Sequence, residues 1–273
     1  MTIIRYTGFS PTSLDNNLPV IGYVNYVTAS NIETNTADAN FPVTNLANAA
    51  THLIWKSGVN TGDERLIFHI NGSTIDYVGV VGHNWAGRTV TISVTSDTSS
   101  PFDTPAFSTV VQATVIADNR PLIFQFIPQA VQTLLITITS DTDTFRQAAV
   151  VYVGLLLTLE RSVKVDVDVP PIQLNRINDI VNGMSESGNF LGRVLSNQKN
   201  EMKLEFSFFT NSWYRANFDP FVLAARDKPF FIAWAPNDYP TDVGYCWLTK
   251  DVVPNLNPVY RRFAATLEMR GIA

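Results

Sequence analysis

The side chains that most often carry out chemistry are few in this sequence, and their spacing matches no familiar site. The three histidines, His52, His69 and His83, have no Cys-x-x-Cys pair beside them, so the ligand spacing of a zinc site is missing. The single cysteine, Cys246, excludes an internal disulfide framework and fits folding in a reducing compartment. The sequence has neither a Gly-x-Ser-x-Gly elbow nor a Gly-x-x-x-x-Gly-Lys phosphate loop.

Pairs of carboxylates offer the remaining chemistry. Asp166 and Asp168 belong to an expected strand over residues 161–169, which places them on one face together with Lys164. General acid and base catalysis needs two carboxyl groups in different environments across a cleft, whereas this arrangement is typical of a solvated strand face. Aspartates also gather in the turns at 96–103 and 140–145, where calcium binding is the alternative to the ordinary preference of turns for Asp. We expect no catalytic residue, no bound metal and no cofactor, and hence a protein that is not an enzyme.

Four residues have the chemistry of a sugar-binding site: Trp55, His83, Asn84 and Trp85. Indole rings stack on sugar faces, and amide and imidazole groups bond to hydroxyls. These residues fall near the expected ends of strands, where β-sandwich modules carry ligand loops. The alternative is structural, with Trp55 filling the end of the core and Trp85 packing where a strand finishes.

Composition limits the classes of protein that remain. The chain has 273 residues, a formal charge of −5 and only 16% charged residues, so it lacks the basic surface of a nucleic-acid binder. The most apolar run, residues 148–159, is shorter than the roughly 20 residues that span a bilayer as a helix. The N-terminus lacks the basic-then-apolar order of a signal peptide. We expect neither nucleic acid nor membrane insertion.

Residues 1–38 have the turn-rich composition of an N-terminal arm, which could pack on its own domain or on a neighbour. Residues 39–160 alternate apolar and polar positions in short runs, which predicts a β-sandwich or jelly roll. Its first two runs, residues 66–70 and 75–82, are expected to form a hairpin through the turn Asn71-Gly72, because Asn-Gly readily supplies the positive φ angles of a two-residue turn.

Residues 161–273 are expected to form a second, smaller β-rich domain that begins near Pro170-Pro171. In it, residues 185–209 are predicted to be two strands joined by a Ser/Asn turn. The one helix should begin at Asp219-Pro220, with Asp219 as the N-cap, and end before Pro229. Three further strands complete the chain. The predicted fold class is therefore all-β, with one short helix.

The order of features in residues 45–159 resembles the galactose-binding-like (discoidin) β-sandwich. The matching features are the turn at Asn45-Leu46, the segment Trp55-Lys56-Ser57, the strands ERLIFHI, IDYVGVVGHN and TVTISVTSD, and the closing apolar strand. One departure concerns the Asp-Gly that usually precedes the Trp-bearing strand, because this chain has NLAN at residues 45–48 instead. The resemblance implies carbohydrate binding as one function, with host surface glycans as the partner.

The C-terminal series GNFLGR, KPFFIAWAP, YP, GYCWL and RRFAATLEMRG is similar to the C-terminal part of tail proteins of long-tailed bacteriophages. That resemblance implies a structural subunit of the distal tail or upper baseplate, folded in the host cytoplasm and found in the virion. Its partners would be copies of itself in a ring and other tail or baseplate proteins. The assembly interface would use the aromatic residues Phe230, Phe231, Trp234, Tyr239 and Trp247. The alternatives to this function are a glycan-binding adhesin and a glycan-cleaving enzyme.

Overall fold

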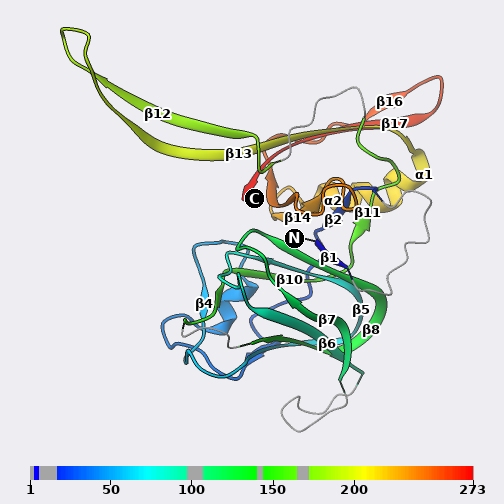
Figure 1. Ribbon diagram of the computed structural model, residues 1–273. Helices are drawn as coiled ribbons and strands as arrows, with labels where there is room; N and C mark the ends of the chain where they lie inside the picture. The colour runs from blue at the N-terminus through cyan, green and yellow to red at the C-terminus, as the bar shows by residue number, and fades with distance from the viewer. Residues whose placement is uncertain (1–2, 6–16, 97–106, 140–143, 165–171, 273) are drawn as a thin grey trace.

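The computed structural model describes residues 3–5, 17–96, 107–139, 144–164 and 172–272. Within them the strands pair almost entirely in antiparallel fashion, and one short α-helical segment accompanies them. The N-terminal half forms a β-sandwich, and a second sheet from the C-terminal half lies against it (Figure 1). The predicted all-β fold class with one short helix is confirmed.

The sandwich is built around two long antiparallel strands, β5 (Glu64–Val81) and β8 (Leu122–Ile138). Both strands bend, so each contributes to both layers. The first half of β5 pairs with β3 and the second half with β10, while the two halves of β8 pair with β6 and β1. The other strands of this sheet are β1 (Ile3–Arg5), β3 (Ile32–Thr34), β6 (Thr89–Thr95), β7 (Ser108–Val115) and β10 (Val150–Gly154).

The predicted hairpin at Asn71-Gly72 is wrong. The φ angles of Asn71 and Gly72 are indeed positive, at 55° and 81°, but β5 continues through them as one strand. Between His69 and Ser73 the strand carries extra residues relative to its partner β8, so the two residues form a bulge. A left-handed pair can reverse a strand or bend it, and here it bends β5 from one layer into the other.

The second sheet follows the order β11-β2-β14-β15-β17-β13-β12, and β16 pairs with β17. Its strand β2 comes from the N-terminal arm and pairs with β14. The described part of the arm that contains β2 therefore packs on its own chain. The strands are β2 (Val20–Gly22), β11 (Leu157–Thr158), β12 (Arg176–Met184), β13 (Phe190–Thr210), β14 (Phe230–Ala233), β15 (Val243–Leu248), β16 (Asn255–Asn257) and β17 (Arg262–Ile272). A small third sheet pairs β4 (Trp55–Lys56) with β9 (Gln147–Ala148).

The two sheets share a buried cluster, so the junction between the two halves of the chain is itself a hydrophobic core. Tyr77 of β5 packs over Gly22 of β2, and Phe231 of β14 packs over Gly79 of β5. A β-carbon on either glycine would come within 2.6 Å of the facing ring, so only glycine permits this approach. The division at residue 160 stays a prediction, and Pro170-Pro171 lies outside the described residues.

The helical segment begins earlier than predicted. It consists of α1 (Asn211–Trp213), the π-turn η2 (Tyr214–Phe218) and α2 (Asp219–Ala224), and Thr210 caps it by accepting a bond from the Trp213 N–H. Asp219 is thus inside the segment and not its cap. Because Pro220 has no N–H and crowds the preceding turn, the helix reaches it only through the wider π-turn. The segment η1 (Val43–Ala47) is a short 3-10 helix.

Two strand predictions in the C-terminal half are also corrected. Residues 190–209 belong to the single strand β13, which β12 joins through a turn at residues 185–189. Residues 161–164 form no strand, although the Lys164 N–H donates to the Glu205 carbonyl at 2.8 Å. Asp166 and Asp168 lie outside the described residues. The three expected C-terminal strands are present as β14, β15 and β17.

Candidate functional site

The two tryptophans of the predicted sugar site are core residues. The side chains of Trp55, in β4, and Trp85, after β5, are fully buried and belong to the cluster inside the sandwich. The Trp55 indole N–H donates to the Thr36 carbonyl at 3.4 Å. Stacking on a sugar needs an exposed ring face, which neither residue offers, and the arrangement matches the structural alternative.

His83 and Asn84 connect loops at the same end of the sandwich. The His83 Nε2 lies 2.8 Å from the Arg120 carbonyl, and its ring packs against Trp85 with a centroid separation of 5.2 Å. Burial lowers the pKa of His83 to about 4, so the ring is neutral at pH 7. The Asn84 amide donates to the Phe145 carbonyl at 2.7 Å and accepts from the Gln147 N–H at 2.9 Å. Glycan binding by these four residues stays a prediction.

Three described carboxylates are buried, namely Glu64, Asp76 and Asp242. Asp242 accepts from the Trp234 indole N–H at 3.2 Å, and the other two lie in the sandwich. Glu64 accepts hydrogen bonds from Thr36 at 2.8 and 2.9 Å and lies 3.9 Å from the buried guanidinium of Arg146. Asp76 accepts a bond from the Leu156 N–H at 2.8 Å, and burial raises the pKa of Asp76 to about 7. Both groups hold segments of their own chain together. Among the described residues, no three His, Cys, Asp or Glu side chains gather to hold a metal ion.

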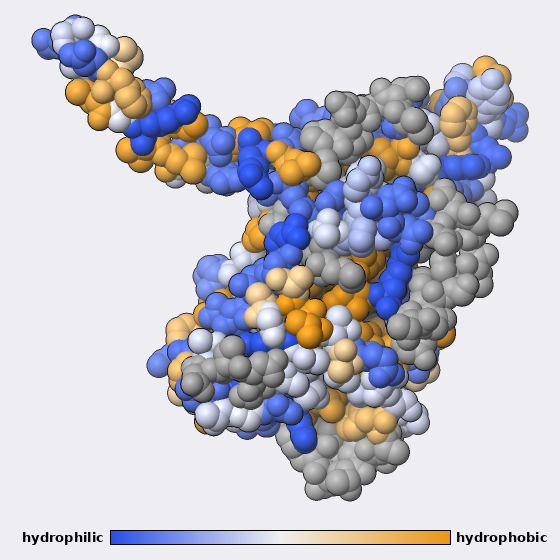
Figure 2. Space-filling model, in the orientation of Figure 1, coloured by the Kyte–Doolittle hydropathy of each residue, from blue (hydrophilic) through white to orange (hydrophobic). Residues whose placement is uncertain are grey.

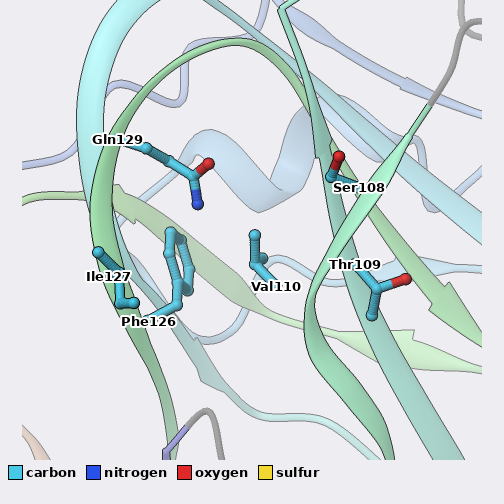
Figure 3. Close-up of a pocket in the computed structure, with 6 residues that line it drawn as sticks. All are labelled: Ser108, Thr109, Val110, Phe126, Ile127 and Gln129. Atoms are coloured by element: carbon cyan, nitrogen blue, oxygen red, sulfur yellow. The ribbon is translucent and has the colours of Figure 1, made fainter. Parts of the chain in front are cut away.

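A shallow groove of about 270 Å³ opens between the start of β7 and the bend of β8. Val110 from β7, with Phe126 and Gln129 from β8, points into the space between the strands (Figure 3). Ser108, Thr109 and Ile127 complete the lining. The lining contains apolar surface, hydroxyls and an amide but no charged group, so it suits a neutral ligand. Sequence reasoning missed this groove, because the bend of β8 creates it.

The aromatic residues of the predicted assembly interface divide into buried and exposed members. Phe230 and Phe231 are fully buried in two different cores. Trp234 stacks on Tyr239 with ring centroids 5.1 Å apart, and Tyr239 and Trp247 are exposed. In this structure Phe230 and Phe231 therefore hold the chain together internally, while Tyr239 and Trp247 remain on the surface.

The hairpin of β12 and β13 is an exposed apolar feature of the described chain. It projects far beyond the body of the molecule (Figure 1), and apolar side chains lie along it (Figure 2). Ile180 pairs with Leu195 and Val181 with Val194, so neighbouring pairs place apolar side chains on both faces of the ribbon. Six apolar side chains toward the tip are 54–68% exposed: Val181, Met184, Phe190, Leu191, Val194 and Leu195.

Comparisons with known proteins give similarity only among solved structures. No protein-family model matches the sequence, and no curated protein matches it. A chitosan-binding module from a Paenibacillus sp. IK-5 chitosanase/glucanase is 16% identical with a TM-score of 0.42, over 48% of this chain and 98% of that one. The family 32 carbohydrate-binding module of C. perfringens NanJ, in complex with galactose, is 12% identical with a TM-score of 0.40, over 50% and 98%.

A third solved structure is the family 32 module of AlyQ in complex with 4,5-unsaturated mannuronic acid. It is 18% identical with a TM-score of 0.37, over 48% of this chain and 96% of that one. All three structures are carbohydrate-binding modules, and each match covers about half of this chain.

The sequence contains a pattern typical of this hairpin, although residues 185–209 were predicted to be two strands joined by a Ser/Asn turn. Residues 190–195 place Phe190, Leu191, Val194 and Leu195 around Gly192 and Arg193, a run in which adjacent apolar residues break strict alternation. Such a run fits a strand with apolar side chains on both faces. What the sequence does not reveal is that no other described segment covers either face. No helix in the described part is long and apolar enough to cross a membrane.

Proposed function

We propose that this protein is a non-catalytic structural subunit that assembles with copies of itself through the β12–β13 hairpin. One observation carries the proposal, namely that the projecting ribbon exposes apolar side chains on both faces. Contiguous apolar surface of this kind typically marks a binding surface. An isolated two-stranded ribbon is at best marginally stable in water, and a partner that covers it would supply the missing burial.

The finer proposal is a subunit of a bacteriophage tail, at the distal tail or upper baseplate, which assembles around the tail axis and braces tail-tip proteins. The C-terminal motifs GNFLGR, KPFFIAWAP and RRFAATLEMRG support it by their resemblance to tail proteins. A ring repeats one contact around its axis, so a modest interface becomes strong through effective concentration. The virion is the location that follows from this function.

Replacing the exposed pair Val181 and Val194 tests the proposal. These residues face each other across the hairpin, so the double variant Val181→Lys/Val194→Glu puts two charges in place of an exposed apolar pair and keeps a favourable cross-strand pair. We expect the wild-type protein to form oligomers, and the variant to lose at least about tenfold in association affinity. Mass photometry and light scattering over a concentration series would measure this, and electron microscopy would show whether the oligomer is a ring.

The matched control is Val115→Lys, which alters another exposed valine, in β7 of the sandwich. It should assemble as the wild type does. A wild-type chain that stays monomeric at every concentration, or a double variant that assembles normally, would contradict the proposed function.

Carbohydrate binding by the sandwich is a second candidate function, favoured by the uncharged groove between β7 and β8. Hydroxyl and amide groups beside apolar surface are the groups that hold neutral sugars. A glycan array should then detect binding, and Gln129→Ala should weaken it about tenfold. Asn84→Ala serves as the comparison, because it removes an amide from the other proposed sugar site. Binding that survives Gln129→Ala would exclude the groove as the sugar site.

A further inference from the structure

A second exposed apolar surface lies at the opposite end of β13 from the hairpin tip. We call it the far-end patch and define it as Phe208, Leu256, Val259 and Tyr260, which are 54%, 46%, 79% and 64% exposed. The rings of Phe208 and Tyr260 meet edge to face with centroids 6.1 Å apart. The patch thus joins β13 to the turn between β16 and β17, which projects at the far side of the sheet (Figure 1).

Phe208 is held outward by a strained backbone. Its φ angle is 66°, in the left-handed region, which a bulky non-glycine residue seldom adopts. Phe206 pairs with Ala265 and Phe209 with Phe263, so β13 advances three residues while β17 advances two. This bulge lets Phe206 and Phe209 both point into the core, where they are buried, and turns Phe208 toward solvent. Backbone strain that is kept at an exposed aromatic residue is typical of a binding site.

We propose that the far-end patch of one copy receives the β12–β13 hairpin of the next copy. The inference rests on the proposed assembly function and assigns the acceptor surface for the hairpin. Hairpin and patch lie at opposite ends of the same strand (Figure 1), so one copy cannot satisfy both of its own surfaces. A contact between two different surfaces is head to tail, and repeated head-to-tail contacts close into a ring when the rotation allows.

The free edges of β12 and β16 favour the hairpin as the segment that binds the far-end patch. β12 is the last strand on its side of the sheet, and β16 pairs only with β17 within the described chain, so each presents an unpaired backbone edge. Such edges readily add a strand from another chain. A nine-residue strand such as β12 gives a ribbon about 30 Å long and about 10 Å wide, or about 300 Å² on each face. A single patch covers one face of the ribbon, so strand pairing along the free edges would supply much of the roughly 800 Å² per partner of a stable contact.

Two variants and their mixture test the inference. Phe208→Gly removes the aromatic side chain and suits the left-handed backbone, so its melting temperature should not fall. We expect this variant alone to associate at least about tenfold more weakly than the wild type. Val181→Lys/Val194→Glu, which lacks a working hairpin but keeps the patch, should also fail alone. Mixed in equal amounts, the intact hairpin of the first variant should bind the intact patch of the second and give a heterodimer. Native mass spectrometry resolves that species.

The outcomes separate this inference from the assembly function itself. If Phe208→Gly assembles as the wild type does while the hairpin variant does not, the hairpin binds elsewhere and only the acceptor assignment is overturned. If both variants fail alone and the mixture stays monomeric, each contact needs both surfaces of both copies, and the head-to-tail arrangement is overturned. A wild-type monomer would overturn the assembly function. Should Phe208→Gly melt at a lower temperature, Tyr260→Ser in the same patch replaces it in each comparison.

Discussion

Replacing Phe231 with alanine is expected to lower the free energy of unfolding by about 3–5 kcal/mol, the usual cost of removing a buried phenylalanine ring. Phe231 is fully buried between the sandwich and the second sheet. Its ring lies 4.9 Å from the Tyr245 ring and 5.5 Å from the Tyr152 ring, measured between centroids. It also covers Gly79, which has no side chain to fill the space that the ring would leave. Urea unfolding followed by tryptophan fluorescence would measure the loss.

The same experiment shows whether the two halves of the chain unfold together. Because they share a core, we expect one cooperative transition in the wild type and, in Phe231→Ala, transitions that separate when fluorescence and circular dichroism are compared. Val115→Ala is the control, because Val115 is exposed in β7, away from the shared core and the hairpin, and its truncation should change the unfolding free energy by less than about 0.5 kcal/mol. A loss below about 1 kcal/mol for Phe231→Ala, which is the size of a surface effect, would contradict the shared core.

Replacing Asp76 with asparagine is expected to change how stability depends on pH. Burial raises the pKa of Asp76 to about 7 from its usual value of 3.8. The unfolded chain therefore releases this proton at lower pH than the folded chain, and the wild type loses stability as the pH rises from about 4 to about 7. The variant lacks this loss, and its amide oxygen can still accept the Leu156 N–H. We expect Asp76→Asn to gain about 2–4 kcal/mol on the wild type between pH 4 and pH 8.

Denaturant unfolding at several pH values would measure that gain. Asp227→Asn removes an exposed aspartate and should leave the pH profile of the wild type unchanged. Parallel profiles for Asp76→Asn and the wild type would show that the Asp76 carboxyl titrates alike in the folded and unfolded chains. In that case its burial between β5 and the segment after β10 would not govern the stability of the junction.

Much of the local structure could be predicted from the residues themselves. Alternation identified β6 (Thr89–Thr95), β7 (Ser108–Val115) and the C-terminal strands, because a strand with one face in a core repeats its apolar residues with period two. The helix was found through Asp219-Pro220, although its start was misplaced. Local rules place Pro in the first turn of a helix. Here Pro220 follows a π-turn in which the rings of Tyr214 and Phe218 pack together, and that tertiary packing is not visible in the local sequence.

For the candidate site, residue type indicated possible chemistry but could not report burial. Trp55 and Trp85 have the chemistry of sugar binding, yet both are sealed inside the sandwich. Phe230 and Phe231 have the chemistry of an interface, yet each fills an internal core. In the segment around Tyr77 and Gly79 the period-two repeat predicted a strand, but the sequence could not say that one of its faces meets β14.

The sequence by itself determined that this chain is β-structured, poor in charge and without a recognisable catalytic or metal-binding motif, because these properties follow from composition and from the period of apolar residues. Tertiary structure alone decided which way each strand turned and what covered it. Asn71-Gly72 bends β5 where the same dipeptide elsewhere would end it, since the partner strand β8 runs on past it. Likewise the hairpin of β12 and β13 is exposed because β12 is the last strand of its sheet. A local sequence pattern does not indicate where a sheet has no further strand.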